Sequence, residues 1–164
     1  MPRIDVQDDL ASWLGAAPEL AGGLGKLSEA VYDRSHLPLR IREVARARIA
    51  DANQCGVCLR TRDAGGPAEG IDEDFYLNVT EWRTWDGYSS RERLAAEFAE
   101  RIALDHHGLR DDESFWLRYR AEFSDAEVVE LGISCALWLG AGRLMRVLDV
   151  AQSCSLVLHE AAAG

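Results

Sequence analysis

The sequence predicts one all-α domain, a compact bundle of about six to eight helices. Apolar residues recur with helical spacing along nearly the whole chain, and no segment alternates with a period of two for long enough to indicate a strand. The chain has 164 residues, of which 48% are hydrophobic, so it can bury a core without disulfide staples. We therefore expect residues 1–164 to form a single domain.

The N-terminal half is predicted to hold three helices. The first begins at Pro18, because proline suits a first helical turn, and extends to about Arg34. The second begins at Pro38 and extends to about Asn53. A third, short helix starts in the cysteine segment and ends at Gly65-Gly66-Pro67.

The C-terminal half is predicted to be helical as well. A short helix near residues 72–79 is followed by an aromatic stretch. Ser89 and Glu92 have the spacing of a capping box, and the helix behind them ends near Gly108. A shorter helix covers about residues 112–123.

A last helix begins at a second capping box, formed by Ser124 and Glu127. It is apolar on nearly all sides, so it is either the central core helix or part of a subunit interface, and we expect a homo-oligomer. Its longest mostly apolar stretch, residues 131–142, is too short to span a bilayer.

The net charge and the N-terminal residues limit the partners and the location that we expect. The formal net charge of −10 repels phosphate backbones, so nucleic acid is not an expected partner. Residues 1–10 lack the continuous apolar core of a signal peptide, and no membrane partner is expected. We expect a cytoplasmic location, where a close cysteine pair is more often catalytic or metal-binding than structural.

The most informative stretch contains Cys55 and Cys58, three positions apart. A helix would place both on one side, with Cys55 at its start, where unpaired N–H groups favour a thiolate. Arg62 would follow one turn later on the same face, and its positive charge would lower a thiol pKa. Glu43, on the preceding helix, could carry a proton if it lies close. Thiol redox chemistry is the leading hypothesis.

A metal site is the weaker alternative. Zinc sites also use such pairs, but the other two cysteines, Cys135 and Cys154, are far apart in apolar or terminal surroundings. A metal would need a histidine from elsewhere in the chain. A thioredoxin-like context would need βαβ units, which are not visible. We therefore expect no metal.

Two further groups of side chains are candidates for the site. His106 and His107 follow Asp105 at a predicted helix end, where capping is the simpler interpretation and a proton relay is the functional one. Trp82, Trp85 and Tyr88 are expected to pack a loop onto the domain or to wall an apolar pocket.

These motifs resemble the carboxymuconolactone decarboxylase and alkylhydroperoxidase (AhpD-like) superfamily over about residues 37–149. The resemblance is carried by LPLRIRE at residues 37–43, CGVC at residues 55–58 and FSDAEVVEL at residues 123–131. It implies an AhpD-like all-α bundle that assembles as a homo-oligomer, commonly a trimer or hexamer. It also implies catalysis by thiols alone, without a cofactor.

The resemblance implies a role for each motif residue. Cys58 resembles the peroxidatic cysteine, which becomes a sulfenic acid, and Cys55 resembles the resolving cysteine, which condenses with it to a disulfide. Glu43 resembles the acid that begins a proton relay. The chain departs from the pattern at Arg62, which stands where the family has histidine, and at Val57 between the cysteines. Because arginine cannot shuttle a proton, three alternatives remain: Glu43 does so alone, His106 or His107 replaces the missing group, or the activity is a different one.

Together these features predict an antioxidant enzyme of the peroxiredoxin type. It would reduce a hydroperoxide or disulfide substrate at the cysteine pair, and an external dithiol would regenerate it. The alternative is a non-enzymatic helical oligomer that binds a small apolar ligand or acts as a redox sensor. Lactone decarboxylation ranks low, since that branch of the superfamily lacks the cysteine pair.

Overall fold

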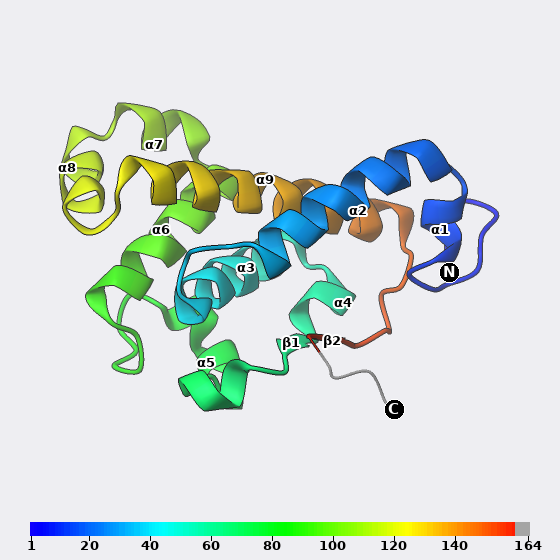
Figure 1. The fold of residues 1–164 in the computed structure, drawn as a ribbon, viewed down its shortest axis with the longest axis horizontal. Helices are drawn as coiled ribbons and strands as arrows, with labels where there is room; N and C mark the ends of the chain where they lie inside the picture. Colours follow the sequence, from blue (N-terminus) through cyan, green and yellow to red (C-terminus); the bar gives the residue numbers. More distant parts are fainter. Residues whose placement is uncertain (160–164) are drawn as a thin grey trace.

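The computed structural model describes residues 1–159, and within them the chain forms nine α-helices and two short strands (Figure 1). The helices are α1 (Ser12–Gly15), α2 (Pro18–Asp33), α3 (Leu39–Asn53), α4 (Gly56–Leu59), α5 (Glu73–Leu77), α6 (Ser90–Leu104), α7 (His106–Asp111), α8 (Glu113–Glu122) and α9 (Asp125–Leu148). Two 3₁₀ turns cover Gly66–Glu69 and Asn78–Glu81. The predicted all-α class is confirmed, and the count reaches nine because two short helices, α1 with four residues and α7 with six, were not predicted.

Helix α3 lies at the centre of the bundle and packs against both α6 and α9. Its buried face includes Val44 and Ile49, which are fully shielded from solvent. Burying an aliphatic side chain of this size stabilises a fold by about 1.5–3 kcal/mol. Elsewhere in the core, Phe98 of α6 stacks with Tyr119 of α8 at a ring-centroid distance of 4.8 Å. The core therefore fixes α3, the helix that leads directly into the cysteine segment.

Both predicted capping boxes are present. The Ser89 hydroxyl accepts from the Glu92 N–H at the start of α6, and Ser124 does the same for Glu127 at the start of α9. Each pair satisfies backbone N–H groups that a helix start leaves unpaired. The two longest C-terminal helices therefore begin where the sequence predicts.

Helix α9 extends well beyond its most apolar stretch, residues 131–142. It has 24 residues, and by length and composition it could cross a membrane. The helix begins at its predicted capping box and continues past the apolar centre in both directions, with Asp149 as its C-cap. In the structure α9 packs against α2, α3 and α6, with Leu131 and Cys135 fully buried.

A small parallel sheet was not predicted. Strand β1 (Thr61–Asp63) pairs with β2 (Leu156–Leu158), in the register Thr61 with Leu156. This pairing ends the third predicted helix early, at Leu59 rather than at Gly65. Each strand has three residues, too few for a visible alternation, and its partner lies far away in the sequence. The correction matters because it changes where Arg62 points.

Candidate active site

The cysteine pair lies at the junction between α3 and α4. Gln54 ends α3 in the left-handed conformation, with φ of 52°, and turns the chain sharply. Cys55 is then the N-cap residue of α4, as predicted, and Cys58 lies within the helix. Their Cα atoms are 5.2 Å apart and their sulfur atoms form a disulfide. Cys55 is fully buried, whereas Cys58 is partly exposed, so the two sulfur atoms differ in access.

Cys58 lines a cavity of about 320 Å³ whose walls come from both ends of the chain. The polar groups in its wall include Tyr32 of α2, Arg46 of α3 and Thr61 of β1. The walls are otherwise mostly apolar, and they include Leu10, Trp13, Leu14, Leu24, Val57, Leu137, Trp138, Met145 and Leu156. No Asp, Glu or Lys is among the lining residues, so the cavity suits a compact apolar molecule and disfavours a cation.

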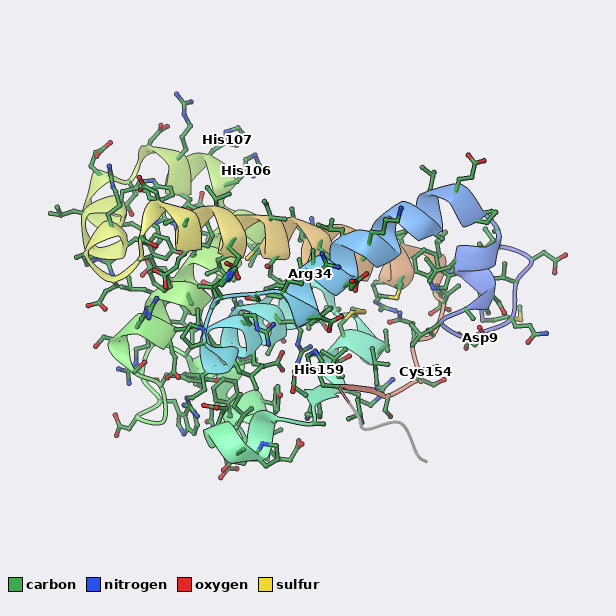
Figure 2. All side chains as sticks on the ribbon, viewed as in Figure 1. Asp9, Arg34, His106, His107, Cys154 and His159 are labelled. Carbon is green, nitrogen blue, oxygen red and sulfur yellow. A yellow bond between two sulfur atoms is a disulfide. The ribbon has the colours of Figure 1, made fainter. Side chains whose placement is uncertain are left out.

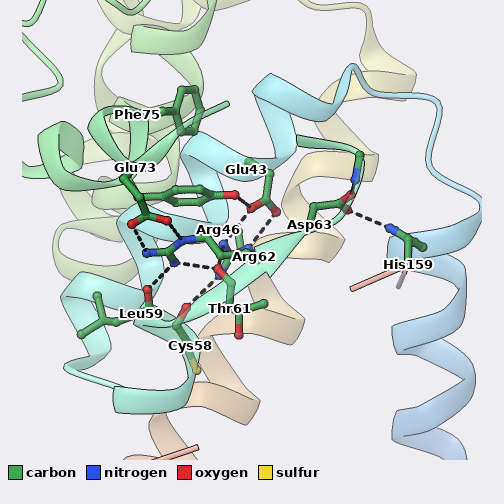
Figure 3. Close-up of polar contacts among 12 residues, drawn as sticks. Glu43, Arg46, Cys58, Leu59, Thr61, Arg62, Asp63, Glu73, Phe75 and His159 are labelled. Atoms are coloured by element: carbon green, nitrogen blue, oxygen red, sulfur yellow. Dashed lines mark hydrogen bonds and ion pairs between the residues drawn. The ribbon is translucent and has the colours of Figure 1, made fainter. Parts of the chain in front are cut away.

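Behind the cysteine helix lies a buried ion pair between Glu43 and Arg46 (Figure 3). The guanidinium donates from Nε and Nη2 to the two carboxylate oxygens, at 2.8 and 2.7 Å. Tyr76 of α5 adds a third bond, from its hydroxyl to Oε2 of Glu43 at 2.7 Å. Both side chains of the ion pair are at most 3% exposed, so the bidentate geometry compensates for costly desolvation.

Glu43 is ionised at neutral pH in this arrangement. Burial by itself raises the pKa of the carboxyl, but the charge and hydrogen bonds of Arg46, with the Tyr76 hydroxyl, outweigh burial and hold the pKa below its ordinary value. With every one of these donors in place, the carboxylate is a weak base. In this geometry Glu43 holds the guanidinium of Arg46 in place. The structure shows no hydrogen bond between Glu43 and either cysteine.

Arg46 connects this pair to the cysteine helix. Its Nη1 donates to the carbonyl oxygen of Cys58 at 2.9 Å, and its Nη2 donates to that of Thr61 at 3.0 Å (Figure 3). A fixed positive charge therefore lies directly behind the residue that lines the cavity. The sequence reasoning missed Arg46, although its position three residues after Glu43 was a usable signal for an i,i+3 pair.

Comparison with known proteins gives matches in structure only. No protein-family model matches the sequence, and no curated protein matches it. A protein of unknown function from Agrobacterium tumefaciens, proposed to be the antioxidant defence protein AhpD, has a TM-score of 0.74 and 20% identity over 91% of this chain and 96% of its own. This chain has the AhpD-like fold.

Two other solved structures share the AhpD-like fold. The debrominase Bmp8, in a cysteine-to-alanine variant bound to 2,3,4-tribromopyrrole, has a TM-score of 0.68 and 18% identity, over 84% of this chain and 72% of that one. An uncharacterised peroxidase-related protein from Silicibacter sp. TM1040 has a TM-score of 0.66 and 16% identity, over 81% and 70%. Identities this low establish the shared fold, and the activity has to be argued from the site.

Arg62 lies elsewhere than expected for the AhpD-like motif. Because α4 ends at Leu59, Arg62 belongs to β1 and is not one helical turn beyond Cys58. Its guanidinium donates to both carboxylate oxygens of Glu73, at 2.8 and 2.9 Å, and lies 4.0 Å from the Tyr76 ring centroid. It also donates a hydrogen bond to the Leu59 carbonyl, but Arg62 is not among the residues that line the cavity.

The structure does not bring His106 and His107 to the disulfide. They begin α7, where the Asp105 side chain caps the helix by accepting from the Gly108 N–H. They therefore lie at a helix start, not at the helix end that the sequence suggested. Both are exposed at the surface, with ring centroids 4.1 Å apart, and Figures 1 and 2 show α7 well away from α4. A proton relay through them to Cys58 is not available in this arrangement.

The aromatic stretch forms packing rather than a wall of the cavity at Cys58. Tyr88 is buried between Phe75 and Trp85, at ring-centroid distances of 5.0 and 4.6 Å. Trp82 donates from its indole nitrogen to Glu100 at 2.9 Å and borders a separate, shallow hollow of about 430 Å³. Neither Trp82, Trp85 nor Tyr88 contributes to the cavity that Cys58 lines.

The remaining cysteines are unbridged. Cys135, on α9, lies in the protein core, where burial raises the pKa of its thiol. Cys154 follows α9 in the sequence and is partly exposed. Across residues 1–159, no group of three or more histidine, cysteine, aspartate and glutamate residues is arranged to hold a metal ion. Within the described residues, the disulfide joins Cys55 and Cys58.

Proposed function

We propose that this protein is a thiol peroxidase of the AhpD-like, peroxiredoxin type, which reduces a small hydroperoxide at Cys58 and is regenerated by an external dithiol. The observation that carries the proposal is the asymmetry of the disulfide, in which Cys58 lines an apolar cavity while Cys55 is buried beside it. An attacking thiol must reach substrate, and a resolving thiol need only reach its partner.

The proposed reaction has two chemical steps on the protein. The Cys58 thiolate attacks the terminal oxygen of the hydroperoxide, an S–O bond forms, the O–O bond breaks, and the alkoxide leaves as an alcohol after taking a proton. The Cys55 thiolate then attacks the Cys58 sulfur, the S–S bond forms, and hydroxide leaves as water after taking a proton. An external dithiol supplies two electrons and two protons and becomes a disulfide, which restores both thiols.

Arg46 provides the electrostatic part of this proposal. Its guanidinium, held by Glu43, donates to the carbonyl of Cys58, and this positive charge beside the residue favours a thiolate at Cys58. Glu43 is thus a positioning residue. This assignment gives Arg46 the part that the sequence reasoning gave to Arg62.

The test compares peroxide consumption by single-cysteine variants with dithiothreitol as the reductant and cumene hydroperoxide as the substrate. We expect Cys58→Ser to reduce the rate to that of the uncatalysed reaction. Cys55→Ser, reduced beforehand and assayed without free dithiol, should consume about one equivalent and then stop, because its sulfenic acid cannot be resolved within the protein. Cys154→Ser is the matched control and should keep the wild-type rate. Equal rates for wild type and Cys58→Ser would reject the proposal.

A second candidate function, binding of a small apolar ligand with redox sensing by the disulfide, is favoured by the cavity itself. A dry cavity of 150 Å³ can bind benzene, so about 320 Å³ suits a larger apolar molecule. The structural neighbour Bmp8 was solved with a brominated pyrrole, a compact aromatic molecule. This candidate would be favoured if a separate binding measurement detected a small apolar ligand while the assay above showed no Cys58-dependent peroxide consumption.

The proposal includes a cytoplasmic homo-oligomer, a trimer or hexamer. One face of α9 exposes the large apolar residues Val129, Ile133, Leu144 and Val147, and such a stripe is typical of a surface covered by another subunit. A reducing compartment with dithiol reductants is needed for turnover, which supports the cytoplasm. The net charge of −10 supports neither nucleic acid nor an anionic membrane surface as a partner.

A further inference from the structure

The segment after α9 runs back over the cysteine helix, and we call residues 150–159 the C-terminal strap. The Gln152 side chain accepts from the Gly56 N–H at 2.9 Å, and Arg60 donates from Nε to the Cys154 carbonyl at 3.1 Å. Ala151 belongs to the same small buried cluster as Cys55. The approach is close enough that a Cβ on Gly56 would lie 2.2 Å from the Gln152 carbonyl oxygen. The strap therefore covers the buried cysteine.

The strap also closes the cavity. Its strand β2 pairs with β1, and the Ala64 N–H donates to the Leu158 carbonyl at 2.9 Å. Leu156 of the same strand lines the cavity beside Cys58 and Thr61. A two-stranded sheet of this length is not stable by itself, so side-chain contacts must hold β2 in place.

His159 makes such contacts at the end of the strap. Its Nδ1 lies 2.8 Å from Oδ2 of Asp63 on β1, and its Nε2 lies 3.0 Å from Oδ1 of Asp33 at the end of α2 (Figure 3 shows the first contact). A neutral imidazole has one N–H, but two ionised carboxylates accept from both ring nitrogens only when both carry a proton. The geometry therefore fits the imidazolium form.

We propose that His159 is a proton-operated clasp, whose charged form holds the C-terminal strap closed over Cys55 and the cavity, and whose neutral form releases it. The proposal concerns access to the disulfide and does not depend on peroxide turnover. It assigns a regulatory role to residues that lie outside the cysteine motif.

The sign follows from the groups that face the ring. Within residues 1–159 these charged groups are Asp63 of β1, which is buried, and Asp33 of α2, which is half exposed. Burial alone lowers the pKa of His159, but the hydrogen bonds and charges of Asp63 and Asp33 outweigh it and raise the pKa above its ordinary value of 6.5. The clasp is thus fully present below pH 6.5 and is lost as the pH rises through the raised value.

Hydrogen exchange at the Ala64 amide tests the clasp, because this N–H is bonded to the strap. We expect its protection factor, corrected for the intrinsic rate, to fall at least fivefold between pH 6 and pH 9 in the wild type. In His159→Gln it should be low at both values. His107→Gln, which changes an exposed histidine on α7, is the matched control and should behave as wild type. An equal pH response in wild type and His159→Gln would overturn the clasp.

Access to the cysteines is measured separately, as the rate at which a phosphine reductant opens the Cys55–Cys58 disulfide. The ratio of rates, His159→Gln over wild type, cancels the pH dependence of the reagent. We expect a ratio of at least five at pH 6 that approaches one at pH 9. A ratio that does not change with pH would overturn control of access by the clasp. Both readouts work on a protein without peroxidase activity, so failure here and failure of the proposed function are distinguishable.

Discussion

Two arginines, Arg46 and Arg62, lie near the ring of Tyr76, and they differ in burial and in their backbone partners. Arg46 is 3% exposed and Arg62 is 28% exposed, yet each makes a bidentate ion pair with a glutamate. The guanidinium of Arg62 lies closer to the Tyr76 ring, at 4.0 Å against 5.9 Å for Arg46. Only Arg46 also donates to the carbonyl of Cys58.

The difference between the two ion pairs is set by burial. An exposed pair is screened by water and contributes about 0–1 kcal/mol, which is the range we expect for Arg62 with Glu73. In the buried pair, each charge depends on the other, because either one alone would remain desolvated and unpaired. A functional arginine is thus identified by its surroundings, and sequence distance from a cysteine is a poor guide.

The largest expected effect comes from removing the buried guanidinium. Arg46→Met should lower the free energy of unfolding by about 3–5 kcal/mol, since it leaves Glu43 buried without a counter-charge and frees two backbone carbonyls. Arg62→Met, the matched control, should cost less than about 1 kcal/mol. Urea denaturation with the disulfide intact measures both.

A double-mutant cycle sharpens this prediction. Replacing both members, as Glu43→Gln with Arg46→Met, should recover part of the loss because no unpaired charge remains. The same cycle on Arg62 and Glu73 should give a coupling near zero. Equal coupling energies in the two cycles would contradict the contrast drawn between them.

The sequence allowed the fold class and the place of the cysteine pair at a helix start to be predicted because these depend on local signals. The capping boxes at Ser89 and Ser124 and the N-cap position of Cys55 each follow from a few neighbouring residues. Glu43 was also selected, through the spacing of its motif.

The burial of Arg46 and the partners of His159 could not be assigned in the same way. Helix α3 carries several charged residues, and packing against distant helices decides which of them are buried. The error at Arg62 has a similar cause, because α4 ends where β1 meets β2, almost a hundred residues later in the chain. His159 meets Asp63 through that same long-range pairing. Contacts between distant segments leave no local pattern to read.

A smaller effect is expected at Tyr76, which lies between the two arginines. Tyr76→Phe keeps the ring against Arg62 but removes the hydroxyl that donates to Glu43 at 2.7 Å. Hydrogen bonds to charged groups contribute about 1.5–3 kcal/mol, and we expect a loss at the lower end because Arg46 still holds the carboxylate. Tyr88→Phe, which removes another buried hydroxyl but one that does not contact Glu43, is the comparison for urea denaturation. The two variants should also differ in pH dependence, since only Tyr76→Phe should raise the pKa of Glu43.

The smallest expected effect, and the most diagnostic, is the pH dependence of the two glutamates. The pKa of Glu43 is held below its ordinary value of 4.5, because Arg46 and Tyr76 outweigh the opposing effect of burial. Its stabilising contribution is therefore present above pH 4.5 and is lost as the pH falls through the lowered value. The stability difference between wild type and Glu43→Gln should shrink steadily below pH 4.5. The Arg62 hydrogen bond also lowers the pKa of Glu73, but solvent screens that pair, so the difference for Glu73→Gln should be small at every pH. Two differences that shrank in parallel would mean that surface charge, and not the buried pair behind Cys58, governs the acid response of this protein.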